Sequence, residues 1–196
     1  MAQYGLALIT APTSEPIQLA EAKVQCGIAE DVGYHDDALR MSIEAARLKV
    51  ETDTGRALIN QTWDLSLDCF PTGLDAIYIP KSPVSSITHV KYYDTSNVEQ
   101  TLATSVYKTI IAREPCEIRL KYQQQWPFIY SEAAVVTVRF VAGYGATYQS
   151  VPDGLRRIML LLIHKDFDPS IGDIEDRYRD LIAQYTVGDE FHCYAR

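Results

Sequence analysis

Residues 36–63 decide the fold of this chain, and they read DDALRMSIEAARLKVETDTGRALINQTW. Apolar residues recur at helical spacing in the first part, which predicts an amphipathic helix over 36–54 with a stripe made by Leu39, Ile43, Ala46 and Val50. Asp36 is placed to cap its first turn, and Gly55 is suited to close its last turn in the left-handed conformation. From Gln61 the pattern changes to that of a strand.

A second long helix is predicted over 153–167, started by Pro152 and Asp153 and ended by the Asp168-Pro169 pair. This segment is so rich in leucine and isoleucine that it must be packed on more than one side. The economical arrangement places it against the helix at 36–54. We expect this scaffold to be formed by Leu39, Ile43, Val50, Leu155, Met159 and Leu162.

The remaining elements follow from local patterns. Two further helices are predicted, at about 18–27 and, with a more polar sequence, at about 173–185. Between the second and third helices, alternating and β-branched runs predict about six strands, at 61–67, 77–79, 87–93, 106–112, 117–122 and 135–141. The sequence therefore predicts an α+β fold, with a helical core of about four helices and an antiparallel β block inserted between the second and third.

This order predicts three segments along the chain. Residues 1–60 form the N-terminal part of the helical core, 61–149 the inserted β subdomain, and 150–196 the C-terminal part of the core. A length of 196 residues suits one large domain or a core with an inserted subdomain. With 47% hydrophobic and 22% charged residues, the composition is that of an ordinary globular protein.

The net charge of −8 is uneven, with −5 in residues 1–53, −3 in residues 173–196 and balance between them. No stretch is basic enough to hold a phosphate backbone, which disfavours DNA binding. An acidic surface is compatible with a wall past which DNA slides, although ordinary solubility explains the same charge and is favoured on charge alone. We expect neither a secretion signal nor a membrane span, because no apolar run is long enough.

Candidate chemical sites are weak, and we predict no catalytic, cofactor or metal site. The four cysteines lack zinc or disulfide spacing and are expected to be reduced and mostly buried. The Asp166-x-Asp168-x-Ser170 motif lacks the glycine and glutamate of a calcium loop. His192 and Cys193 are adjacent but have no further ligands. His164 is interpreted as a partly buried packing residue, and acid pairs such as Asp36-Asp37 and Glu175-Asp176 as helix starts, which leaves a carboxylate hydrolase disfavoured.

Thirteen tyrosines are a further feature, and many fall in or beside the β block. Tyrosine combines contact area with a polar tip, so these residues and Trp126 can line an interface. Tyrosine also favours strands, and the two interpretations have equal weight. An alternative function is therefore an accessory β-module that binds a peptide or glycan, with Tyr92, Tyr93, Tyr107, Tyr122, Tyr130, Tyr144 and Tyr148 near its surface.

Several motifs, in order along the chain, resemble one family. The helix ending in TGRALI-x-QTW is followed by L-x-L-x-x-FP at 65–71, by IP-x-x-PV-x-SI at 79–87 and by VRFVAGYG at 138–145. PIQLAEAK at 16–23 and VPDGLR at 151–156 extend the likeness, which covers about 16–165. This ordered set resembles the head–tail connector (adaptor) proteins of long-tailed phages and gene transfer agents. The likeness fades after His164.

The resemblance implies a structural virion protein and not an enzyme. Relatives form a ring, typically of twelve copies, beneath the portal, where they continue the DNA channel and present a surface to a head-completion (stopper) or tail terminator protein. They act at the head–tail junction, are made in the host bacterial cytoplasm, and need no cofactor or membrane. Their C-terminal segments commonly reach the portal, which implies portal contacts here at Ile171, Ile174, Tyr178, Leu181 and Ile182.

Overall fold

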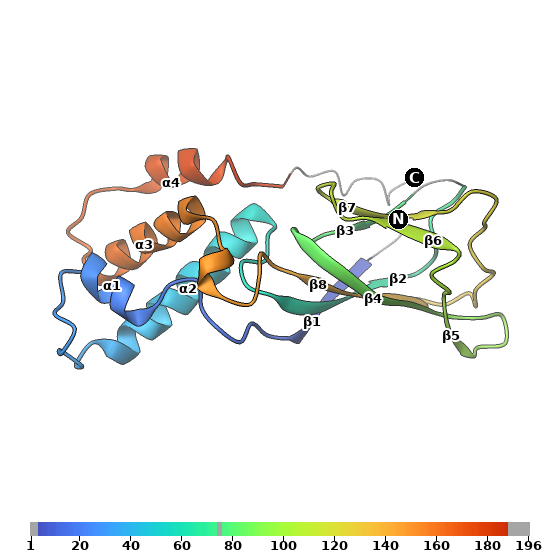
Figure 1. The fold of residues 1–196 in the computed structure, drawn as a ribbon, viewed down its shortest axis with the longest axis horizontal. Helices are drawn as coiled ribbons and strands as arrows, with labels where there is room; N and C mark the ends of the chain where they lie inside the picture. Colours follow the sequence, from blue (N-terminus) through green and yellow to red (C-terminus); the bar gives the residue numbers. More distant parts are fainter. Residues whose placement is uncertain (1–3, 74–75, 188–196) are drawn as a thin grey trace. The chain divides into compact units, whose positions relative to one another are not determined.

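The computed structural model describes residues 4–73 and 76–187 (Figure 1). They divide into a helical unit, 12–60 and 144–187, and a strand unit, 4–11, 61–73 and 76–143. Residues 4–11 differ from our prediction, since we placed them in the helical core. The strands between the second and third helices pair in an antiparallel manner, and the predicted α+β class is confirmed.

The helical unit contains α1 (Leu19–Gln25), α2 (Asp36–Thr54), α3 (Asp153–Phe167), α4 (Glu175–Ile182) and a short 3-10 helix at Tyr148–Ser150. The bounds of α2 and α3 are those predicted. These two helices pack against each other, and each also contacts α1 and α4. Helix α3 therefore packs against three other helices, which is why its sequence is apolar around most of its circumference.

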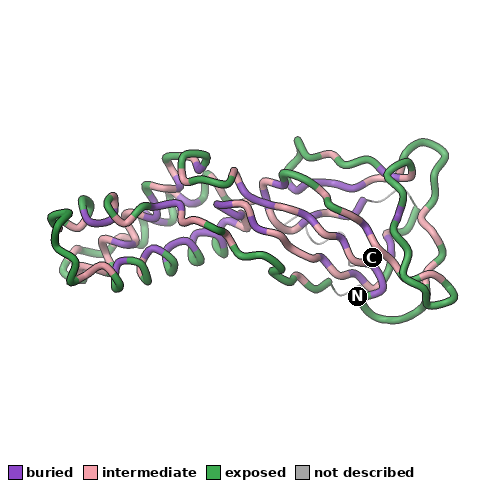
Figure 2. The backbone as a smooth tube through the Cα atoms, turned by 60° about the horizontal axis from the view of Figure 1, so that its bottom comes forward, coloured by how far each residue is buried: buried purple, intermediate pink, exposed green. Residues whose placement is uncertain are grey.

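One hydrophobic cluster joins segments that lie more than a hundred residues apart. It includes five of the six residues that we expected in the scaffold, namely Leu39, Ile43, Val50, Leu155 and Met159, each no more than 3% exposed. Leu162 packs against the cluster but is half-buried. Figure 2 shows buried and exposed residues alternating along these helices, as expected for elements that share one core.

Helix ends are fixed by local contacts, with one difference from the prediction. Gly55 closes α2 with a positive φ of 69°, and the backbone N–H of Gln18 donates to Glu21 Oε2 at 3.0 Å at the start of α1. Asp36, however, does not cap α2. Its carboxylate pairs with Lys23 Nζ at 2.7 Å, because the buried ammonium of Lys23 needs a counter-charge more than the exposed first turn needs an acceptor.

The strand unit has two antiparallel sheets. The larger has the order β1-β2-β8-β4-β5 and the smaller β3-β7-β6. Their alternating patterns bury one face, as in β8, where Val136, Val138 and Phe140 are fully buried. We predicted neither β1 nor β5. The strands are β1 (Tyr4–Thr10), β2 (Gln61–Leu67), β3 (Ile77–Ile79), β4 (Val84–Tyr93), β5 (Glu99–Thr101), β6 (Tyr107–Ile110), β7 (Cys116–Leu120) and β8 (Val136–Ala142).

Candidate assembly surfaces

Helix α4 is fastened to α2 by a polar contact at the edge of the helical core. The hydroxyl of Tyr178 donates to Asp53 Oδ2 at 2.6 Å, and Lys49 Nζ lies 3.0 Å from the same oxygen. Lys49 Nζ also lies 4.8 Å from the centroid of the Tyr178 ring. Just after α4, the N–H of Val187 donates to the carbonyl of Thr54 at 2.9 Å. The end of the described chain is therefore held along α2.

The predicted portal contacts do not all lie at the surface. Tyr178 is 3% and Ile182 is 7% exposed, and both belong to the hydrophobic cluster of this chain. They are part of its own core, which corrects the expectation that they face a partner. Ile171, Ile174 and Leu181 are half-buried, and Leu181 packs against the cluster. The apolar surface available in this segment is therefore centred on Ile171 and Ile174.

Tyr178→Phe is expected to lower the free energy of unfolding by about 1 kcal/mol at neutral pH. Burial alone would raise the pKa of Asp53, but hydrogen bonds from Tyr178 and Lys49 hold this pKa below its ordinary value of 3.8. Because folding lowers the pKa of Asp53, its ionised carboxylate stabilises the folded protein fully at pH values above the ordinary pKa. This stabilisation is lost as the pH falls through the lowered pKa of the folded state. In urea denaturation, the gap between the two proteins should therefore shrink on acidification. A gap independent of pH would contradict this role of Tyr178.

The outer side of α2 carries a second apolar stripe that we did not predict. Met41, Ala45 and Leu48 are exposed and follow helical spacing, and the Met41 side chain is 73% exposed. Beside them lies a groove of about 340 Å³, lined by Ser42, Ala45, Ala46, Lys49, Leu162, Lys165 and Asp166. The sequence signal that could have predicted this stripe is the i, i+4, i+7 spacing of apolar residues that starts at Met41. An exposed apolar stripe of this kind is typical of a surface that meets another protein.

The two units differ in net charge. The helical unit holds sixteen acidic and ten basic side chains, a net charge of −6. The described part of the strand unit holds seven of each. An acidic helical surface repels the phosphates of DNA and favours basic protein surfaces.

A long connection between β7 and β8 carries exposed aromatic residues. Trp126 anchors it, because its ring stacks on Phe70 with centroids 4.8 Å apart and an interplanar angle of 7°. Tyr122 and Phe128 are 88% and 89% exposed. Tyr107, in contrast, is buried in β6, so the tyrosines of the β block do not form one surface.

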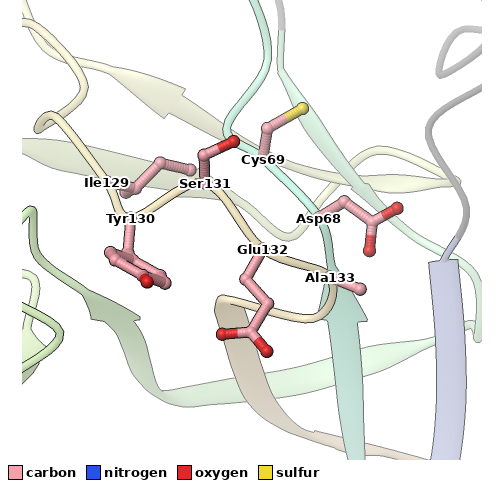
Figure 3. A pocket seen from close by; sticks show the side chains of 7 residues that line it. All are labelled: Asp68, Cys69, Ile129, Tyr130, Ser131, Glu132 and Ala133. Atoms are coloured by element: carbon pink, nitrogen blue, oxygen red, sulfur yellow. The ribbon is translucent and has the colours of Figure 1, made fainter.

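An open cleft of about 420 Å³ lies beside this connection (Figure 3). Asp68 and Cys69 line one side, and the opposite side is formed by residues 129–133. Figure 3 shows the carboxylates of Asp68 and Glu132 pointing in different directions, so they do not converge on one bound group. Asp68 instead accepts a hydrogen bond from the N–H of Ala134 at 2.9 Å. The cleft therefore lacks the paired groups of a catalytic site.

Titratable side chains elsewhere make structural contacts. His164 is half-buried and shares a hydrogen bond with Gln25 Nε2 at 3.2 Å, as predicted for a packing residue. Asp168 accepts hydrogen bonds from the backbone and hydroxyl of Ser170, which forms a turn.

Burial, aided by the Glu117 charge, raises the pKa of the Cys116 thiol to about 11, so this thiol is unreactive at neutral pH. Cys69 is exposed, which differs from the expectation of mostly buried cysteines.

The described residues contain no group of three or more histidine, cysteine, aspartate or glutamate side chains arranged to hold a metal ion. His192 and Cys193, which we discounted as metal ligands, lie outside the residues that the structure describes. Within 4–73 and 76–187, every helix is too short or too polar to cross a lipid bilayer.

Comparison with known proteins found one matching family model and several similar solved structures. A family model described as "Phage gp6-like head-tail connector protein" matches residues 16–121, more than half of the chain. One similar solved structure is a chain of the virion of a native gene transfer agent particle, with 23% sequence identity and a TM-score of 0.77, over 93% of this chain and 95% of that chain. A chain from the neck of a native gene transfer agent particle, computed with C12 symmetry, is 22% identical with a TM-score of 0.73, over 94% and 96%. Among curated proteins, none matches the chain.

Proposed function

Because this chain belongs to the phage gp6-like head-tail connector family, we propose that it is a structural virion protein that forms a ring adaptor between portal and tail. The family match carries the proposal. It is supported by a fold shared, over more than nine-tenths of both chains, with proteins of a gene transfer agent particle. In this role the protein completes the head, continues the DNA channel and has no enzymatic activity.

The ring contains twelve copies in this proposal. A similar chain comes from a neck computed with C12 symmetry, and another comes from a neck computed with C6 symmetry. A ring of twelve copies is compatible with both symmetries. A closed ring needs a heterologous interface, in which one surface of a copy meets a different surface of the next. The exposed stripe of Met41, Ala45 and Leu48 on α2 supplies one apolar surface of this kind. The particle is a tailed phage or a gene transfer agent.

The portal is the proposed partner on the head side, and a stopper or tail terminator protein the partner on the tail side. Ile171 and Ile174 precede α4 and offer the apolar contact to the portal, with half-buried Leu181 at its margin. DNA passes the ring without being held, in agreement with the net charge of −6 on the helical unit. The protein is made in the host bacterial cytoplasm and acts at the head–tail junction, without a cofactor or membrane.

A peptide- or glycan-binding β-module is the less favoured alternative. Its support was the set of tyrosines in the β block, but Tyr107 is buried and only Tyr130 lines the open cleft. The family match concerns connector proteins and gives this alternative no support.

Ile174→Asp tests the portal contact. Ile174 occupies the N-cap position of α4, where aspartate is favourable, so the helix should form normally. Loss of a buried apolar contact and burial of a charge should weaken binding to portal-bearing capsids more than tenfold, measured by co-sedimentation. Ile111→Asp is the matched control, because Ile111 is a 42% exposed isoleucine in the strand unit. Equal binding by both variants would refute a contact at Ile174, and absence of binding by the unchanged protein would refute the adaptor role.

A further inference from the structure

Strand β1 differs from the other sheet edges in the described part of the chain. The two sheets end in β1, β5, β3 and β6. Three of these are only three or four residues long, and they carry or adjoin features that discourage further pairing, namely Glu99, Lys108 and Pro80. β1 has seven residues, YGLALIT, with no charge and no proline, and it pairs regularly with β2 from Tyr4 to Leu8 before an irregularity between Leu8 and Thr10. A long, uncharged, apolar edge is a template for an additional strand.

The buried layer of the larger sheet is open at this edge. Leu6 of β1 lies opposite Leu65 of β2, and Leu8 lies opposite Trp63. Residues opposite each other in an antiparallel pair share a face, so Leu6 and Leu8 extend the row that contains Leu65. Leu65 is fully buried, whereas Leu8 is 46% exposed. The row of apolar side chains therefore extends from buried Leu65 on β2 to β1, where Leu8 is only partly covered by the described residues.

Apolar side chains other than Leu8 are also exposed on β1. Ala7, on the opposite face, is exposed, and Ile9, at the irregularity between Leu8 and Thr10, is 47% exposed. A strand with apolar side chains exposed on both faces gains burial on both when another strand is added next to it. Backbone hydrogen bonds would supply affinity, and the alternate side chains would supply specificity.

We propose that β1 accepts an extended, uncharged strand from a different protein of the particle, the partner on the tail side of the ring, and that this strand becomes the sixth of the sheet. The strand has apolar side chains at alternate positions, packed over Leu6 and Leu8, and no charge next to the uncharged edge. The choice of a different protein rests on the proposed ring. Among the described residues of a second copy, the remaining sheet edges have three or four residues and are too short to match seven. A symmetric β1–β1 pair closes after two copies and so cannot form the ring.

Leu8→Lys tests the site in particles assembled with the full chain, since a lysine on an edge strand discourages pairing. Val98→Lys is the matched control, because Val98 is a 51% exposed aliphatic residue in the same unit, beyond the end of β4. We expect Leu8→Lys to form rings of normal mass that bind portal-bearing capsids but to join tails at least tenfold less often. Val98→Lys should join tails normally. Rings of Leu8→Lys that join tails like the control would overturn the proposal, while the adaptor function would stand.

Amide hydrogen exchange and cross-linking identify the occupant. Residues 4–10 should exchange at least tenfold more slowly in the assembled particle than in the free ring. A photoreactive residue introduced as Ala7→benzoylphenylalanine should cross-link to a different virion protein, since Ala7 is exposed on β1. Cross-links to a second copy, or to residues 188–196 of the same chain, would overturn the proposal, as would unchanged exchange. Failure of the unchanged protein to form a ring would instead count against the proposed function.

Discussion

Arg47→Ala is expected to lower the free energy of unfolding by about 3 kcal/mol. Arg47 is 6% exposed on α2, with its Nε 2.8 Å from Glu15 Oε2 and its Nη1 3.2 Å from Glu51 Oε2. Glu51 is equally buried, and its other oxygen accepts the N–H of Leu58 at 2.8 Å. Removing the guanidinium takes a charged partner from the buried carboxylate of Glu51 and from Glu15, which costs more than the loss of one surface contact.

Urea denaturation at neutral pH measures this effect, and Arg40→Ala is its control on the same helix. The Arg40 side chain is 59% exposed, and it pairs with an Asp37 side chain that is 98% exposed. An exposed pair contributes at most about 1 kcal/mol, so the control should differ little from the unchanged protein. Similar, small effects of the two substitutions would show that Arg47 does not hold the start of the helical unit to α2.

Met159→Ala should destabilise the helical unit by about 3 kcal/mol. Met159 is fully buried on α3, in the cluster that also contains Ile43 and Val50 of α2. The substitution removes apolar surface and leaves a cavity that the two helices can only partly fill. Because α3 contacts all three other helices, the loss should loosen the whole unit and lower the cooperativity of its unfolding.

Met41→Ala provides the matched control for this prediction. Met41 lies on α2 but is 73% exposed, so the same chemical change should cost less than about 0.5 kcal/mol. The two variants differ in a second readout, since Met41→Ala removes part of the proposed ring surface. It should weaken ring formation in native mass measurements without lowering stability. If Met159→Ala were as mild as Met41→Ala, the packing between α2 and α3 would not carry the stability of the unit.

The long helices could be predicted because their signals are local. The apolar stripe from Leu39 to Val50 and the glycine at position 55 fixed the bounds of α2, and Pro152 marked the start of α3. That these two helices share one core followed from α3 being too apolar for a single buried face. The confirmed α+β class rests on these elements and on alternation within the central strands.

Other features depend on contacts that sequence patterns do not specify. β1 is apolar without strict alternation, so its pairing with β2 and its exposed edge had no periodic signal. Tyr178 and Ile182 form an apolar face that suits a partner or the chain's own core equally well, and only the packing of α4 on α2 decides between them. Asp36 fits a helix cap by position, but the buried Lys23 takes its carboxylate.

The measurement that tests the ring most directly is single-particle imaging of the full chain bound to portal-bearing capsids. We predict a closed ring of twelve copies at the head–tail junction, with α2 and α3 packed together within each copy and Ile174 at the portal. A chain that remained monomeric on portal-bearing capsids, or a ring in which Ile174 lay away from every neighbouring protein, would contradict this account.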